Sequence, residues 1–96
     1  MKFRRTPSFY DDFGGLESRD QQAVKDAFPD VARALQGDVE LFNRFRIKRM
    51  KGHPEIWEGH VRGNSLCFTF QYEYTTDGEK VCFFRKVGTH DIYSNP

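Results

Sequence analysis

A run of cations is the first feature of this 96-residue sequence that could do chemistry. Residues 44–51, Arg-Phe-Arg-Ile-Lys-Arg-Met-Lys, hold five basic side chains and no acidic one. Such clustering can mark a strip that binds phosphate groups. A solvated strand face explains the same run equally well, because charged side chains also favour exposed positions. The charge pattern alone leaves both interpretations open.

Arg85 is a second cation that could have a chemical role. It stands where the alternation of residues 81–87 would place an apolar side chain. A β-bulge could shift the alternation at this point, or the aliphatic stem could cover the edge of the core while the charged head stays in water. The third interpretation is that the guanidinium is placed there for function, and the sequence favours none of the three.

The histidines and cysteines do not form a metal motif. None of the three histidines and two cysteines has the spacing of zinc ligands, and His53 and His60 have no nearby partners to complete a site. The sequence also has no glycine-rich loop that would cradle a nucleotide phosphate. We therefore expect neither a metal ion nor a cofactor.

The composition is that of a small domain with little net charge. Fifteen basic and fourteen acidic residues give a net charge of +1, but residues 1–40 hold six basic and eight acidic residues, whereas residues 41–96 hold nine basic and six acidic. Ten phenylalanines in 96 residues indicate that a few large rings fill the core. No apolar run approaches the roughly 20 residues that span a bilayer, and no secretory signal is evident, so we expect a cytoplasmic protein that does not bind membranes.

The elements that must position these side chains begin with helices. Ser8 is a candidate N-cap for a short helix over residues 9–13. Ser18, with Gln21 at the spacing of a capping box, predicts a second helix that runs to about residue 36. Pro29 lies inside that second pattern and predicts a kink or a break near Phe28.

Strands occupy the rest of the chain. A short strand is expected at residues 2–5, and the apolar period changes to two at residues 45–50, 56–62, 66–74 and 80–87. Asp77-Gly78 is typical of a two-residue hairpin. That turn would pair Phe68 with Val87 and Phe70 with Arg85, and would place Cys82 opposite Glu73, too far from Cys67 for a disulfide.

These elements predict a single α+β domain over residues 1–96. The expected order is a short N-terminal strand, two helices and then a four-stranded antiparallel meander, with the helices packed on one face of the sheet. The large aromatic side chains would then form the core between the helices and the sheet.

The motifs resemble the RelE/ParE superfamily, the toxins of bacterial type II toxin–antitoxin systems. The likeness covers nearly the whole chain and rests on the segment 45–52, the Trp-Glu-Gly-His-Val strand at 57–61 and the Phe-Arg-Lys-Val-Gly-Thr-His ending at 84–90. The ending is its most specific part and is similar to YafQ-like and RelE-like ribonucleases. The resemblance implies the RelE-like microbial ribonuclease fold.

The resemblance also implies a function. The expected activity is ribosome-dependent cleavage of mRNA, without a metal, by attack of a ribose 2′-hydroxyl on the neighbouring phosphate, which inhibits translation. The catalytic residues it implies are His90 and His60 for proton transfer, Arg85 for the phosphate charge and Tyr93 for base stacking or proton transfer. The implied RNA-binding residues are Arg46, Lys48, Arg49, Lys51 and Lys86. The implied partners are a cognate antitoxin protein, the ribosome and mRNA.

Other interpretations of these residues remain open. His60 could equally be a partly buried strand residue, and His90 could be an ordinary surface residue. A binding protein with the same fold, such as a ParE-like inhibitor of DNA gyrase or a RelE-like member without catalysis, is the alternative function. His90 favours the ribonuclease, whereas the near-neutral charge favours the alternative.

Overall fold

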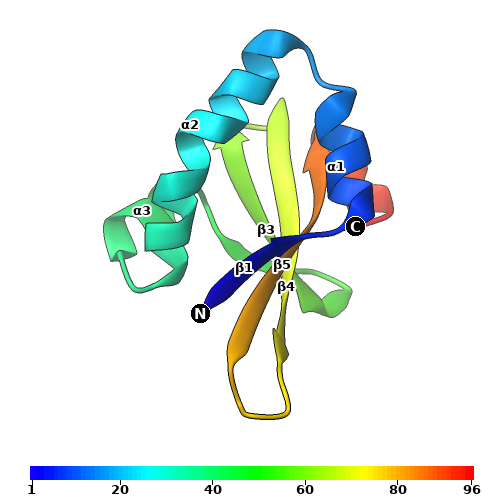
Figure 1. Ribbon diagram of the computed structural model, residues 1–96. Helices are drawn as coiled ribbons and strands as arrows, with labels where there is room; N and C mark the ends of the chain where they lie inside the picture. Colours follow the sequence, from blue (N-terminus) through cyan, green and yellow to red (C-terminus); the bar gives the residue numbers. More distant parts are fainter.

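Five strands and three α-helices form an α+β fold in the computed structural model, which describes residues 1–96 (Figure 1). In chain order the elements are β1 (Lys2–Arg5), α1 (Pro7–Gly14), α2 (Ser18–Leu35), α3 (Val39–Arg44), β2 (Lys48–Met50), β3 (His53–Arg62), β4 (Leu66–Tyr74), β5 (Lys80–Gly88) and the 3₁₀-helix η1 (His90–Ser94). The sheet order is β1-β5-β4-β3-β2, with β1 parallel to β5 and every other pair antiparallel. The predicted architecture is confirmed, with α3 and η1 as additions.

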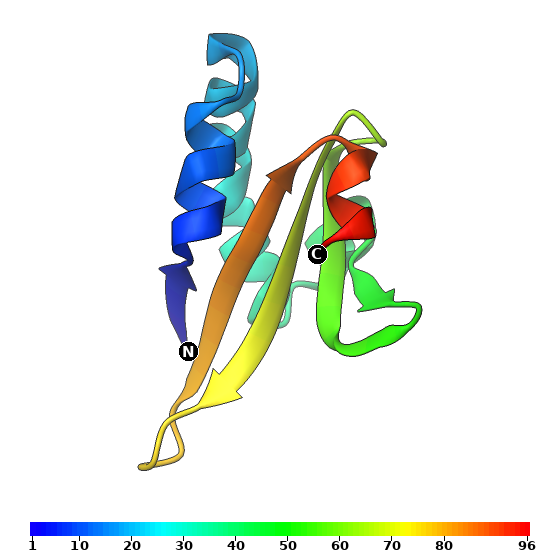
Figure 2. The same cartoon turned by 90° about the vertical axis from the view of Figure 1, so that its right-hand side faces the viewer.

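The sheet separates two layers. Figure 2 shows α1 and α2 on one side of the sheet and η1 on the other. Phenylalanines fill the space beneath the helices: the ring centroid of Phe28 lies 4.7 Å from that of Phe84 and 5.5 Å from that of Phe68. Phe9 of α1 joins them at 5.7 Å from Phe28. The phenylalanine excess of the sequence is therefore the core between helices and sheet.

Helix α1 begins earlier than the sequence predicts. The N-cap is Thr6, not Ser8: its Oγ1 accepts a hydrogen bond from the backbone N–H of Phe9 at 3.2 Å. Pro7 occupies the first turn, where its missing N–H would have had no helical partner. The Thr6 hydroxyl also donates to the carbonyl of Arg85 at 3.0 Å, so the cap ties α1 to β5.

Helix α2 differs from the prediction at its start and in its middle. Its N-cap is Glu17, which makes no side-chain capping bond, so the capping box predicted for Ser18 is wrong. The helix runs without interruption through Pro29, so the predicted break does not occur. A proline inside a helix costs about 3 kcal/mol, whereas each fully buried aliphatic side chain contributes about 1.5–3 kcal/mol. The buried side chains that hold this helix on the sheet are Val24, Val31 and Leu35.

Helix α3 ends at Arg44, directly before the predicted strand, and its C-terminal turn uses the first residues of that strand. Asp38 caps it by accepting a hydrogen bond from the N–H of Leu41 at 3.1 Å. The chain leaves α3 through Arg46, whose φ of 52° is the left-handed conformation of a helix C-terminus. The strand predicted over residues 45–50 is therefore shortened to Lys48–Met50.

The β4–β5 hairpin has a different register from the predicted one. Thr75 pairs with Glu79 across a three-residue loop in which Gly78 has a φ of 85°, instead of the two-residue turn expected at Asp77-Gly78. Phe70 therefore faces Phe84, not Arg85, and Cys82 faces Tyr72, not Glu73. A β-bulge then restores the predicted pairing of Phe68 with Val87.

The bulge explains the misplaced cation. Arg85 and Lys86 together lie between the core positions Phe84 and Val87, whereas the partner strand has only Thr69 between Phe70 and Phe68. Both cations therefore leave the helix side of the sheet. Of the two structural interpretations that the sequence left open, the bulge is the correct one.

Candidate functional site

Polar side chains collect on the sheet face that lies away from α1 and α2. Alternation along β3 and β4 sends every second side chain to this face, and η1 folds back over it (Figure 2). Three of its residues are buried although they are polar: Glu58, His60 and Thr69. Every buried side-chain nitrogen and oxygen has a hydrogen-bond partner. Buried side chains on a sheet are more often apolar, so this group of hydrogen-bonded polar residues is our candidate site.

His60 is held in one orientation beneath the surface. Its neighbour Gly59 has no side chain, and a Cβ there would overlap the Phe68 ring, so the core packs directly on this backbone. His60 therefore points to the opposite face, where its Nδ1 lies 2.9 Å from the carbonyl oxygen of Gly63. A carbonyl only accepts, so Nδ1 carries the proton and the Nε2 of the neutral ring is an acceptor.

Tyr93 lies between the two candidate histidines. Its hydroxyl is 3.4 Å from His60 Nε2, and its ring centroid is 4.6 Å from that of His90, edge to face. The N–H of His90 donates to the carbonyl of Asn64 at 3.0 Å, which fixes η1 to the β3–β4 turn. Burial, and then the contact with Cys67, raises the pKa of the Tyr93 phenol, so this phenol is a proton donor at neutral pH.

The sequence did not predict two members of the cluster, Glu58 and Cys67, and both adjoin His60. Glu58 Oε1 lies 3.4 Å from His60 Nε2 and 3.8 Å from the amine of Lys48. Cys67 pairs with His60 across β3 and β4, and its thiol donates to the Gly63 carbonyl at 3.3 Å. Burial raises the pKa of Cys67, which keeps it a thiol. The sequence could have indicated Glu58 only by its position two residues before His60, and Cys67 only by its predicted pairing with His60.

Arg85 lies on the same face but not beside the histidines. Its Nη1 donates to Gln71 Oε1 at 2.7 Å and its Nε to the backbone oxygen of Pro96 at 3.1 Å. Pro96 is buried, and the same oxygen accepts from Thr69 Oγ1 at 3.3 Å. Cys67, Thr69 and Gln71 follow one another along this face of β4. Cys67 pairs with His60, Thr69 contacts Pro96, and Gln71 contacts Arg85. Pro96 therefore lies between the histidine end of this face and Arg85.

The predicted RNA-binding cations do not form one strip. Lys48 pairs with Glu58 and lies on the candidate-site face, whereas Arg49 pairs with Trp57 and places its guanidinium 5.2 Å from the indole centroid. Lys51 is exposed in the β2–β3 turn. Arg46 is exposed, and its charge works to lower the pKa of Cys67 and of Tyr93, which places it near the site.

Lys86 belongs with Arg85 and not with the β2 cations. It pairs with Thr69 and is half-buried. It also lines a small recess of about 110 Å³ with Arg85, Thr6, Ser8 and Pro96. The structure thus groups Arg46 and Lys48 with the histidines, and Lys86 with Arg85.

The cluster has no arrangement of metal ligands. No three side chains among histidine, cysteine, aspartate and glutamate come together as they would around a metal ion. None of the helices has the length and apolar character needed to cross a membrane.

The comparisons with known proteins bear on the fold. No family model matches the sequence, and no curated protein matches it. Among solved structures, a chain of the E. coli DinJ–YafQ complex is similar: the TM-score is 0.56 at 11% identity, over 94% of this chain and 93% of that one. The likeness shows a shared fold over nearly the whole chain.

Proposed function

We propose that this protein is the toxin of a type II toxin–antitoxin system and acts as a ribosome-dependent, metal-independent mRNA endonuclease. The observation that carries the proposal is the placement of Tyr93 between His60 and His90 on a face that also holds Lys48, with the charge of Arg46 nearby. The fold shared with a chain of the DinJ–YafQ complex supports it, because the C-terminal motif resembles YafQ-like toxins.

The proposed reaction uses the nucleophile that RNA carries. The ribose 2′-oxygen attacks the neighbouring phosphorus, the bond from phosphorus to the 5′-oxygen breaks, and the products are a 2′,3′-cyclic phosphate and a 5′-hydroxyl. One group must accept the 2′-hydroxyl proton and another must donate a proton to the leaving oxygen. His90 and Tyr93 are the groups that would contact RNA, since His90 is exposed and Tyr93 is half-buried.

His60 would act through Tyr93. Only 6% of His60 is exposed, so RNA cannot reach its ring directly. Its Nε2 can accept the phenolic proton of Tyr93 at 3.4 Å, and Glu58 at 3.4 Å would stabilise the imidazolium that results. His60 and Glu58 are therefore positioning residues in this proposal, and Tyr93 carries the proton to or from RNA.

The cations would bind the RNA backbone and the phosphate charge. Arg46 and Lys48 lie near the histidines, and with Arg49, Lys51 and Lys86 they would hold flanking phosphates of mRNA and of the ribosome. Arg85 would stabilise the phosphate charge once its Nε leaves the Pro96 oxygen. The partners in this proposal are the ribosome, mRNA and a cognate antitoxin, and the compartment is the cytoplasm.

The test is expression of the chain alone in bacteria, with mRNA ends mapped by primer extension. Wild type should arrest growth and cut mRNA within translated frames. His90→Ala should lower cleavage about 10²- to 10⁴-fold, as is typical for loss of an acid–base group, while the exposed position leaves the fold unchanged. The matched control is His53→Ala, which removes a histidine from the start of β3, away from the candidate site, and should leave cleavage intact.

Two outcomes would refute the proposal. Cleavage that persists unchanged in His90→Ala would show that the chemistry is assigned to the wrong group. Intact mRNA with a loss of DNA supercoiling would favour a ParE-like gyrase inhibitor, the alternative that the net charge of +1 supports.

A further inference from the structure

An aromatic surface lies uncovered on the helix side of the sheet, beyond the helices themselves. The β4–β5 hairpin extends past all three helices (Figure 1), and alternation along β4 places Tyr72 and Tyr74 on the helix side there. Trp57 of β3 continues this surface, since its ring centroid lies 6.1 Å from that of Tyr72. Tyr74 is 68% exposed, whereas Trp57 and Tyr72 are half-buried at the edge of the core. These three residues form an aromatic platform on the opposite side of the sheet from the candidate site.

Two cations lie against these rings without a carboxylate partner. The guanidinium carbon of Arg49 is 5.2 Å from the Trp57 ring centroid, and the amine of Lys80 is 4.0 Å from that of Tyr72. Neither cation is among the ion pairs of the molecule. The carboxylate of Glu79, next to Lys80 in sequence, instead pairs with Lys2 at 3.6 Å. The platform therefore carries positive charge that the protein itself does not neutralise.

The polar atoms of the aromatic platform are also unpaired. The indole N–H of Trp57 and the hydroxyls of Tyr72 and Tyr74 take part in none of the hydrogen bonds of the molecule. Burial raises the pKa of Tyr72 to about 12, so its hydroxyl keeps its proton at neutral pH. A complementary ligand therefore combines flat apolar rings with oxygens that accept hydrogen bonds and carry negative charge.

We propose that the aromatic platform binds single-stranded nucleic acid, with bases stacked on its rings and backbone phosphates bound by Arg49 and Lys80. Such a strand brings a flat ring and a negative charge with every nucleotide. Tyr72 and Tyr74 are two strand positions apart, about 7 Å, so neighbouring rings can each take one base of an extended strand. An acidic protein segment would match the cations but would offer few flat rings. This site goes beyond the proposed function, because it needs neither His60 nor His90.

Trp57 is the only tryptophan of the chain, so its fluorescence reports on the platform directly. The probe is a 2′-O-methyl oligouridine of about 10 nucleotides, which has no free 2′-hydroxyl and so cannot be cut by the proposed reaction. Stacking should quench the fluorescence of Trp57. A deoxythymidine strand of the same length should also quench it, because every base has a flat face. Titrations at several salt concentrations give the affinity and its salt dependence.

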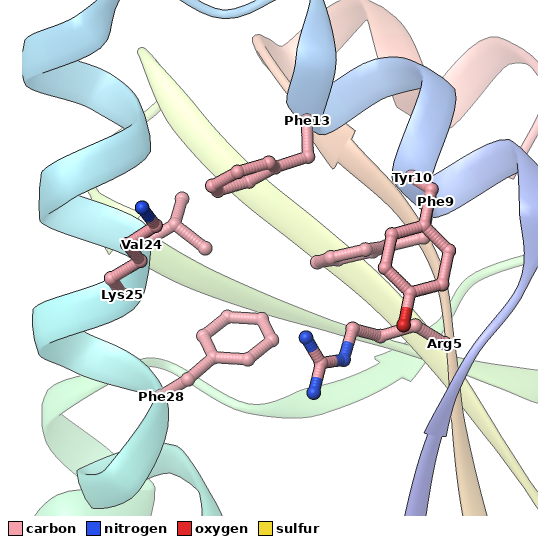
Figure 3. Close-up of a pocket in the computed structure, with 7 residues that line it drawn as sticks. All are labelled: Arg5, Phe9, Tyr10, Phe13, Val24, Lys25 and Phe28. Atoms are coloured by element: carbon pink, nitrogen blue, oxygen red, sulfur yellow. The ribbon is translucent and has the colours of Figure 1, made fainter.

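Two single variants separate stacking from charge. Tyr74→Ala should weaken binding about 5- to 150-fold, as is typical for the loss of one stacked base, and should leave the salt dependence unchanged. Lys80→Gln should reduce the slope of log affinity against log salt by about 0.7, the value for one lost phosphate contact. The matched controls, Tyr10→Ala and Lys25→Gln, make the same changes at exposed positions of α1 and α2 (Figure 3) and should alter neither quantity.

Several results would overturn the nucleic-acid site. These are no quench at low salt, equal weakening by Tyr74→Ala and Tyr10→Ala, or tighter binding of polyglutamate than of either oligonucleotide. The outcomes for this site and for the proposed function are separable, because the platform and the candidate site lie on opposite faces. Oligonucleotide binding by a chain that cuts no mRNA would refute the proposed function alone. Cleavage of mRNA by a chain whose Trp57 no oligonucleotide quenches would refute the platform alone.

Discussion

The two faces of the sheet are buried in opposite ways. Towards the helices, Phe68, Phe70 and Phe84 are at most 4% exposed and contact other rings. On the other face, Glu58 and His60 are at most 8% exposed, and each needs a polar partner. Buried apolar area stabilises the fold directly, whereas a buried polar group at best recovers its lost hydration through hydrogen bonds. The helix face therefore holds the fold, whereas the buried polar groups of the η1 face add little to its stability.

The largest effect should come from the helix face. Phe68→Ala should lower the free energy of unfolding by about 3–5 kcal/mol, because Phe68 is fully buried among aromatic rings. Phe83→Ala is the matched control, since Phe83 is a half-buried phenylalanine that points away from the helices, and it should cost much less. Urea unfolding followed by tryptophan fluorescence measures both. Equal losses would remove the distinction between the faces.

The next effect is a loss of stability in alkali that originates on the helix face. Burial raises the pKa of Cys82 from 9.0 to about 12. The unfolded thiol releases its proton first, so this stabilisation is complete below about pH 9 and is lost as the pH rises towards 12. At pH 10.5 Cys82 should account for about 2 kcal/mol of the loss, so the loss should be smaller by that amount in Cys82→Ala, in which the raised pKa values of Tyr72, Tyr93 and Cys67 still act. Unfolding free energies at pH 7 and pH 10.5 test this, and an equal loss in both proteins would contradict it.

On the η1 face, a change should alter activity more than stability. Tyr93→Phe keeps the ring against His90 but removes the hydroxyl that lies 3.4 Å from His60 Nε2. Cleavage should fall about 10- to 100-fold, while the free energy of unfolding changes by about 1 kcal/mol or less. Single-turnover cleavage on purified ribosomes gives the rate. Unchanged cleavage would limit Tyr93 to a packing role.

The sequence could predict the helix face well because that face follows regular periods. Alternation located β3, β4 and β5, and helical spacing located α2. The errors arose where one residue changes the register. The three-residue loop at Gly78 shifts the hairpin by one position, and the bulge at Arg85 shifts it back. Arg85 itself was the visible signal, as a cation in an apolar series.

The η1 face could be predicted only in part because its contacts join segments with no shared period. His60, Tyr93 and His90 were singled out, yet their contact requires η1 to fold back onto the β3–β4 turn. The neighbours Glu58 and Cys67 depend on that same pairing, and no local pattern marks them.

The smallest effect should come from the Thr6 hydroxyl, which ties α1 on the helix face to the bulge of β5. Thr6 Oγ1 caps α1 on the helix side and donates to the carbonyl of Arg85, the residue at the bulge. Thr6→Ala should cost about 1 kcal/mol through the lost cap. Thr6→Ser should restore that stability, whereas Ser8→Ala, at the cap position that the sequence favoured, should change it by less than about 0.5 kcal/mol. If the hydroxyl also holds the bulge, Thr6→Ala should shift the backbone amide resonances of Arg85 and Lys86, and Ser8→Ala should not. Equal spectra for the two alanine variants would show that the Thr6 hydroxyl does not hold the bulge, and would leave the Asp12 carboxylate, which accepts from the N–H of Val87 at 3.2 Å, as the side-chain contact from α1 to this part of β5.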